Sequence, residues 1–266
     1  MVELSPVAQI SLITLFGLLL GSFLSMLTWR LPRMMEWEGE AQLKHISFTR
    51  SHCPNCNTTL SWKELIPVFS WLISKGQCKH CKTSISARYP LIELATMLLT
   101  LIVALHFGLD AKGWFALIFT WLLIAITVID MEHQLILDIL SLPLLWLGLI
   151  INSQSVFTDP INAIWGAVIG YMLLWTLFYA FKFLTKKEGM GFGDFKLLAA
   201  MGAWFGVEAL AQIILIASLS SILWIVVLSL FHRRNLQEPV AFGPFLALGG
   251  LCTLLLGSSF IFSLIG

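Results

Sequence analysis

The stretch Gly189-Met190-Gly191-Phe192-Gly193-Asp194-Phe195-Lys196 joins a lysine-containing loop to an apolar block that runs from residue 195 to residue 231. A carboxylate therefore stands where the chain changes from polar to apolar. The glycines allow backbone angles that other residues avoid, and they let a second segment approach closely. An acidic group at the start of the predicted helix is favoured by the helix macrodipole.

The composition around this stretch is that of a membrane protein. Of the 266 residues, 58% are hydrophobic and 12% are charged, and the mean hydropathy is +0.87. Soluble domains are about 45–50% apolar and about 25% charged. The net charge of +1 gives no reason to expect nucleic acid as a partner. The sequence therefore predicts an all-α, polytopic protein whose surroundings are a lipid bilayer.

About eight apolar segments are predicted to cross the bilayer, since a spanning helix needs roughly 20 residues. The block at 195–231 is too long for one crossing, and Gly202, Trp204, Gly206 and Glu208 offer a place to turn. Its first half is expected to be short or partly re-entrant. The first segment is expected to remain as an anchor. The predicted crossings are 8–29, 90–107, 113–130, 138–152, 161–183, two within 195–231, and 243–266.

The basic residues predict the orientation. All of the sixteen Lys and Arg residues except Lys112, and including Lys44, Arg233 and Arg234, fall in or beside the loops 30–89, 131–137, 184–194 and 232–242. Loops rich in Lys and Arg face the cytoplasm. Both termini are therefore predicted to be periplasmic.

That topology places Asp130 and Asp194 at the same cytoplasmic edge. Ionisable groups within a membrane protein are costly and usually face a bundle interior or a wet cavity. Two neighbouring carboxyl groups cannot both ionise easily, so they share a proton. One can then activate water while the other protonates a scissile carbonyl. We predict that the two aspartates form such a pair and cleave a peptide bond.

Simpler interpretations exist for each of these residues. Asp194 could cap its helix, and Asp130 could be an interfacial charge. Glu132 and Asp138 compete with Asp130 as the first acid, and Asp138 could instead be the N-cap of the next helix. Lys196 could steer an acidic substrate residue or simply mark the cytoplasmic edge.

Four of the five cysteines form two pairs, Cys53-Pro54-Asn55-Cys56 and Cys78-Lys79-His80-Cys81, separated by 21 residues. In a reducing compartment such pairs indicate a metal more often than disulfides. Four thiolates suit tetrahedral zinc, and a metal would stabilise a loop with little apolar core. A redox dithiol pair is the alternative, and His52 or His80 could replace a ligand. The prediction is structural zinc held by Cys53, Cys56, Cys78 and Cys81.

Several motifs in order resemble those of the bacterial type IV prepilin peptidases, which are aspartic leader peptidases of the inner membrane. Gly191-x-Gly193-Asp194, followed by Phe195-Lys196, is similar to the GxGD motif of that family. Ser25 stands where the family often has Asn, and Leu137 where a Pro often precedes the second Asp. Further similar blocks are Gly21-Ser22-Phe23-Leu24 with Arg30-Leu31-Pro32, and the segments 65–72, 88–93 and 242–250.

The resemblance implies a site and an activity. It implies Asp130 and Asp194 as the catalytic pair, with Gly191, Gly193 and Lys196 supporting the loop or the substrate. Type IV prepilins and the pseudopilins of type II secretion would be the substrates, and the bacterial inner membrane the location. The expected domains are a first transmembrane helix at 1–29, a cytoplasmic zinc-binding loop at 30–89 and a transmembrane catalytic domain at 90–266.

The resemblance also implies a second activity. Family members with this cysteine loop methylate the new N-terminal residue with S-adenosylmethionine. No glycine-rich nucleotide fingerprint marks the methyl-donor site, which stays unknown, although Arg88 and Glu93 could contribute to it. Two other classes of protein remain as alternatives. One is a polytopic transporter that uses the two aspartates as proton or ion sites, and the other is a zinc-ribbon scaffold that recruits a cytoplasmic partner.

Overall fold

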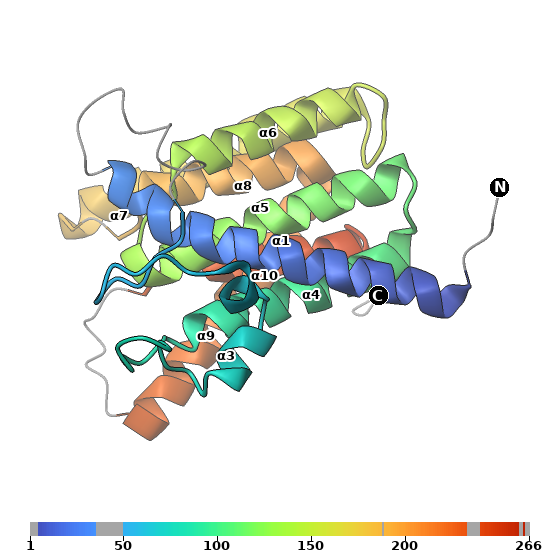
Figure 1. Cartoon of the computed structure of the whole chain (residues 1–266). Helices are drawn as coiled ribbons and strands as arrows, with labels where there is room; N and C mark the ends of the chain where they lie inside the picture. The colour runs from blue at the N-terminus through green and yellow to red at the C-terminus, as the bar shows by residue number, and fades with distance from the viewer. Residues whose placement is uncertain (1–4, 36–49, 188, 233–239, 261–262, 264–266) are drawn as a thin grey trace. The chain divides into compact units, whose positions relative to one another are not determined.

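The computed structural model describes residues 5–35, 50–187, 189–232, 240–260 and 263. Within these residues every regular element is a helix (Figure 1), and the extended pairings are two isolated bridges in the cysteine loop. The all-α prediction is confirmed for this part of the chain. The chain divides into two compact units, Met1–Trp121 and Leu122–Gly266, which are described separately.

The first unit contains two long helices that pack closely through glycine. A Cβ atom on Gly21 would lie 2.7 Å from the Cα of Glu93, and Gly17, one turn earlier, meets the second helix in the same way. Small residues at this spacing let helix backbones approach in membranes. The Arg88 guanidinium adds a hydrogen bond of 2.8 Å to the Thr28 hydroxyl. The elements of this unit are α1 (Pro6–Met35), the 3-10 helix η1 (Trp62–Leu65), α3 (Phe69–Ile73), α4 (Arg88–Phe107) and the first part of α5 (Ala111–His133).

Helix α1 continues past residue 29, where the sequence predicts its end, and it includes Pro32 in its last turns. Arg33 explains the extension. Its guanidinium lies 3.3 Å from the centroid of the Trp29 ring and donates a hydrogen bond of 2.7 Å to the Trp29 carbonyl. A basic side chain near the end of a helix bonds to the terminal carbonyls and interacts favourably with the macrodipole. The Arg30-to-Arg33 segment therefore completes the helix.

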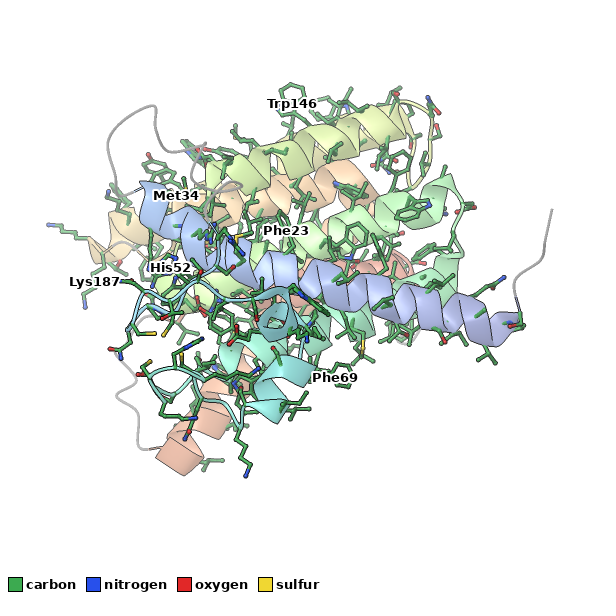
Figure 2. The ribbon with its side chains drawn as sticks, in the orientation of Figure 1. Phe23, Met34, His52, Phe69, Trp146 and Lys187 are labelled. Carbon is green, nitrogen blue, oxygen red and sulfur yellow. The ribbon has the colours of Figure 1, made fainter. Side chains whose placement is uncertain are left out.

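The second unit is built around one short helix. This helix is α8 (Phe192–Phe205), and from Asp194 to Phe205 each of its residues except Lys196 is buried, as expected for a helix that is apolar all round. Figure 1 shows α6 (Asp138–Asn152) beside α8, and the Trp204 indole of α8 donates to the Leu144 carbonyl of α6. Trp146, on the outer side of α6, is exposed (Figure 2). The helices are α6 (Asp138–Asn152), α7 (Pro160–Thr185), α8 (Phe192–Phe205), α9 (Val207–His232) and α10 (Gly243–Leu256).

The predicted turn within the block 195–231 is confirmed at Gly206. This residue has a φ of 82° and ends α8, and α9 begins at Val207. Glycine suits this position because side chains disfavour positive φ. The Val207 N–H donates to the Asn162 side-chain oxygen at 3.0 Å, which satisfies one of the free donors at the start of α9.

Five described helices are long and apolar enough to cross a membrane, namely α1, α4, α5, α7 and α9. Helices α6 and α10 are apolar but shorter. Helix α8 has 14 residues, which gives a length of about 21 Å against a hydrocarbon core of about 30 Å. A multi-pass membrane protein is therefore supported, and the count of eight crossings is not confirmed.

Candidate active site and metal centre

Asp130 lies in the last turn of α5 with its carboxyl group buried against the start of α10. The side chain is 5% exposed, and its Oδ2 accepts a hydrogen bond of 3.0 Å from the N–H of Gly243. Gly243 is the first residue of α10, so the carboxylate sits at the positive end of that helix. A Cβ atom on Gly243 would lie 2.5 Å from the same oxygen. Only glycine therefore fits beside Asp130.

Asp194 lies in the first turn of α8 and is 7% exposed. Its side chain makes no capping hydrogen bond, since the N-cap position is Gly191. Within the described residues its Oδ1 is buried and has no hydrogen-bond partner. A buried polar atom without a partner is rare and often marks a catalytic role. The simpler interpretation of Asp194 as a helix cap is wrong.

Ile136 brings the two aspartates together. A Cβ atom on Gly193, which precedes Asp194, would lie 2.6 Å from the Ile136 Cβ. A Cβ atom on Gly243 would lie 2.9 Å from Ile136 Cδ1. Asp130, which is bonded to Gly243, and Asp194, which follows Gly193, therefore both lie beside Ile136. Residues remote in sequence thus form one buried acidic site.

Two of the three glycines of the opening stretch, Gly189 and Gly193, lie so close to a neighbouring residue that a Cβ atom would clash, and none of the three has an unusual backbone angle. Gly189, Gly191 and Gly193 are absent from the positive-φ positions. Gly193 is needed because Ile136 fills the space where its side chain would be. Gly191 has ordinary extended angles, with φ −83° and ψ 150°, and its carbonyl accepts the N–H of Asp194 at 3.3 Å.

The competing acids lie elsewhere. Glu132 is exposed at the end of α5. Asp138 is not an N-cap, because Leu137 holds that position. Its carboxylate instead forms an ion pair of 2.5 Å with the Lys196 ammonium. Lys196 therefore ties the start of α8 to the start of α6, a role that the sequence did not suggest. It is part of the scaffold around Asp194.

In the first unit, the four predicted cysteines form a cluster with the dimensions of a metal site. Their sulfur atoms all lie within 4.8 Å of one another, and the Cys53 and Cys81 sulfurs are 3.7 Å apart. Four sulfurs at about 2.3 Å from a central zinc ion are about 3.8 Å from each other. Cys53 and Cys78 are buried, and Cys56 and Cys81 are half-buried. The cluster can hold a metal such as zinc.

The two halves of the cluster repeat one local structure. The Cys53 N–H donates to the Thr58 carbonyl at 3.0 Å, and the Cys78 N–H donates to the Thr83 carbonyl at 2.9 Å. A residue with positive φ, Asn57 in one half and Lys82 in the other, follows the second cysteine of each pair. The sequence signal is a Cys-x-x-Cys-x-Thr pattern that occurs twice, and its threonines were not among the predicted site residues.

The threonines of this pattern also act on the thiols. Hydrogen bonding by the Thr83 side chain, with its backbone, lowers the pKa of Cys81 to about 5. The Thr58 side chain lowers the pKa of Cys56 for the same reason. The thiolate is the form that binds metals. At Cys56 and Cys81 the local structure therefore favours the thiolate, whereas the pKa of Cys53 is raised above its usual value.

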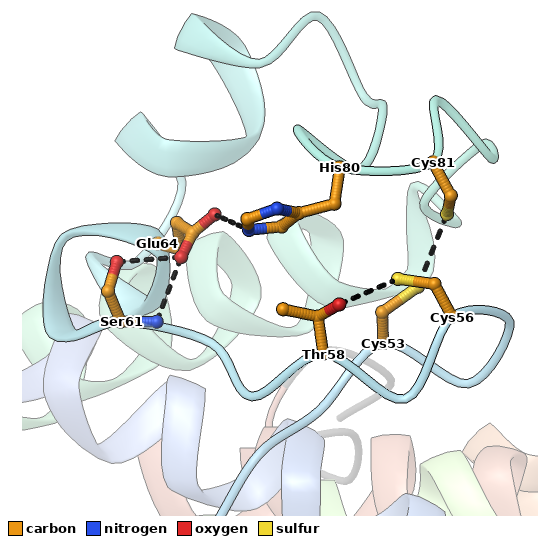
Figure 3. Close-up of polar contacts among 7 residues, drawn as sticks. All are labelled: Cys53, Cys56, Thr58, Ser61, Glu64, His80 and Cys81. Carbon is orange, nitrogen blue, oxygen red and sulfur yellow. Dashed lines mark hydrogen bonds and ion pairs between the residues drawn. The ribbon is translucent and has the colours of Figure 1, made fainter.

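Neither neighbouring histidine belongs to the cluster. Figure 3 shows the His80 ring turned toward Glu64, with Nε2 3.9 Å from the carboxylate. The Ser61 hydroxyl and N–H both donate to Glu64 and lower its pKa. The His52 Nδ1 lies 3.2 Å from the Arg50 carbonyl oxygen. The set of metal-binding side chains found in the described residues consists of the four cysteines alone.

Comparison with known proteins gives matches over almost the whole chain. The family model described as "Bacterial Peptidase A24 N-terminal domain" matches residues 15–107. The family model described as "Type IV leader peptidase family" matches residues 117–227. No solved structure matches the chain.

Curated relatives carry the name "Prepilin leader peptidase/N-methyltransferase". The protein from Aeromonas salmonicida is 43% identical over 273 residues, which covers 96% of this chain and 93% of the relative. The protein from Pseudomonas aeruginosa is 45% identical over 267 residues, which covers 95% of this chain and 92% of the relative. The protein from Dichelobacter nodosus is 42% identical over 262 residues, which covers 92% of this chain and 90% of the relative.

Proposed function

Because the chain belongs to the type IV leader peptidase family, we propose that it removes the leader peptide from type IV prepilins and pseudopilins and then N-methylates the new N-terminus. The observation that carries the first activity is the pair of buried carboxyl groups, Asp130 and Asp194, which helices α5, α8 and α10 bring to the same place beside Ile136. The names of the relatives join both activities. The comparisons do not favour the transporter alternative.

The chemistry assigns different roles to the two aspartates. Asp130 accepts the Gly243 N–H at the start of α10 and is suited to hold negative charge. Asp194 has an oxygen that accepts no hydrogen bond from the described residues, and it is suited to hold the shared proton. In the proposed reaction Asp130 takes a proton from water while Asp194 gives its proton to the peptide carbonyl. The water oxygen bonds to the carbonyl carbon, the C–N bond breaks, and the leaving amine takes up a proton.

The basic residues support a cytoplasmic position for the loops beside this site. Lys182, Lys186 and Lys187 cluster at the end of α7, and Lys196 begins α8. Lys44, Arg233 and Arg234 lie outside the described residues. By the positive-inside rule this distribution supports the bacterial inner membrane, with both termini in the periplasm. A prepilin leader cut at the cytoplasmic face would meet the two aspartates there.

The second activity requires a methyl donor. When bound, S-adenosylmethionine supplies a methyl group whose bond to sulfur breaks while the electron pair stays on sulfur. The new N-terminal amine of the pilin, in its neutral form, would accept that methyl group and then release a proton to water. The cleavage reaction produces the amine, so it must come before methylation.

We assign zinc to the four-cysteine cluster, with a structural role because all four positions are filled by protein. Cys53→Ser is expected to lower zinc from one ion per chain and to reduce thermal stability strongly, since structural zinc contributes on the order of 10 kcal/mol to small domains. Metal analysis and thermal unfolding of the purified protein measure both effects. Cys252→Ser, which removes the cysteine outside the cluster, serves as the control with full zinc. An active wild-type protein without metal would contradict the assignment.

The proposed function is tested with purified protein in detergent and a purified prepilin. Mass spectrometry of the pilin should show loss of the leader and, on addition of S-adenosylmethionine, a gain of one methyl group on the new N-terminus. A pilin that keeps its leader would reject the peptidase assignment. A cleaved pilin that never gains the methyl group would reject the second activity alone.

A further inference from the structure

The first unit contains a cavity that neither the aspartate pair nor the cysteine cluster uses. Its volume is about 570 Å³, and it is bounded by the second half of α1, both cysteine pairs, the η1–α3 segment and the start of α4. Met34 and His52, which both line it, are labelled in Figure 2. Sites for drug-sized ligands have volumes of about 300–1,000 Å³. The cavity is therefore large enough for a nucleoside-sized molecule.

One wall of the cavity carries a buried carboxylate. Glu93 on α4 is 6% exposed, and its Oε2 accepts a hydrogen bond of 2.6 Å from the Val68 N–H. The Ser22 hydroxyl also bonds to this carboxylate. Buried carboxylates are rare unless they are paired or serve a function.

The backbone next to Glu93 is strained. Val68 has a φ of 61°, which is a genuine outlier for a β-branched residue. Such strain persists only where the surroundings impose it, and it concentrates at functional sites. The Val68 N–H is the donor to Glu93, so the strained residue is bonded directly to the buried carboxyl group.

The other wall carries fixed positive charge. The Arg33 guanidinium is stacked on the Trp29 ring and bonded to the Trp29 carbonyl, which limits its freedom. A guanidinium has five N–H donors, so further donors remain for a ligand. Arg30 and Lys79 also line the cavity. A carboxylate is the group that such a held guanidinium binds best, through paired hydrogen bonds.

The aromatic side chains Trp71 and Tyr89 complete the lining. The cavity thus offers a buried carboxyl group, an ordered guanidinium and flat apolar surface. S-adenosylmethionine has a matching set of groups, since it carries a carboxylate, two cationic groups and a flat adenine ring. The residues present therefore fit this donor.

We propose that this cavity is the methyl-donor site of the proposed methyltransferase, with Arg33 binding the carboxylate of S-adenosylmethionine and Glu93 facing its cationic groups. The assignment rests on the proposed second activity and gives it a location. Arg88, a candidate for this site on sequence grounds, instead donates a hydrogen bond to Thr28 of α1. It supports the packing of α1 on α4 and is not assigned to the ligand.

The test is equilibrium binding of S-adenosylhomocysteine, S-adenosylmethionine and 5′-methylthioadenosine to the full-length protein in detergent. Arg33→Met is expected to lower the affinity for S-adenosylhomocysteine and S-adenosylmethionine about 10- to 100-fold. It should leave 5′-methylthioadenosine, which lacks the amino-acid end, unchanged. Glu93→Gln should lower the affinity for S-adenosylmethionine more than the affinity for S-adenosylhomocysteine, because the sulfur of the second ligand is neutral. Glutamine can still accept the Val68 N–H, so the local structure should be kept.

Lys63→Met is the matched control, because it removes a basic residue of the same loop that does not line the cavity. It should bind all three ligands as the wild type does. Zinc content and prepilin cleavage should be unchanged in every variant. If both cavity variants bind the ligands normally, the cavity assignment is wrong and the proposed function stands. If the wild type binds none of the ligands, the methyltransferase half of the proposed function fails as well.

Discussion

Asp194→Asn is expected to lower the rate of prepilin cleavage by about 10³-fold or more, since a positioned acid or base contributes roughly 10²–10⁴-fold. An amide has nearly the same shape as the carboxyl group but cannot donate and regain the shared proton. Because Asp194 makes no side-chain capping bond, the fold should survive the change. Single-turnover cleavage measured by mass spectrometry, together with thermal unfolding, checks both parts of the prediction.

Glu132→Gln provides the matched control for this experiment. It removes a carboxylate two residues after Asp130, on the exposed end of α5. Exposed substitutions usually change energies by less than about 0.5 kcal/mol, which corresponds to about twofold in rate. A folded Asp194→Asn protein that cleaves prepilin at the wild-type rate would remove Asp194 from the reaction.

Gly243→Ala is expected to reduce cleavage about 10²-fold, because a catalytic group displaced by about 1 Å can lose that much rate. The added Cβ would lie 2.5 Å from the Asp130 Oδ2, so the carboxylate must move. Substrate binding should change less than the chemical step. Measurement of kcat and KM separately, with prepilin as substrate, distinguishes the two.

Ala247→Gly, in the next turn of α10, is the control for general weakening of the helix. It removes a buried methyl group and lowers helix stability by about 1 kcal/mol, but adds no atom beside Asp130. It should lower the melting temperature and leave the chemical step intact. Equal losses of kcat in the two variants would mean that α10 acts only through its stability.

Much of the fold was predictable from the lengths of the apolar segments and from the few residues that interrupt them. The turn at Gly206 was predictable because a block of that length needs an interruption and glycine permits the positive φ found there. The end of α1 was not predictable, because charged residues usually terminate an apolar segment and the sequence therefore indicated an end before Arg30. Here Arg33 folds back onto Trp29 and continues the helix. Side-chain geometry, and not composition, decides that boundary.

The acidic and cysteine residues of the candidate sites were predictable from the sequence. The contacts that support these residues were not. Asp130 and Asp194 stand out because carboxylates are rare at the edges of apolar segments. The importance of Gly243 and Ile136 depends on which helices meet, and no local pattern reveals this. Glu93 and Arg33 form a cavity only after α1 and the cysteine loop have folded. Lys196 was recognised as part of the motif, but its partner Asp138 is 58 residues away.

The central claim, that Asp130 and Asp194 act as one acid–base unit, is tested most directly by comparing Asp130→Asn, Asp194→Asn and the double variant in single-turnover cleavage of a prepilin. Residues that work as a unit show strongly non-additive effects. The account predicts that the double variant is no slower than the slower single variant. Losses that multiply in the double variant, or a single variant with undiminished cleavage, would contradict it.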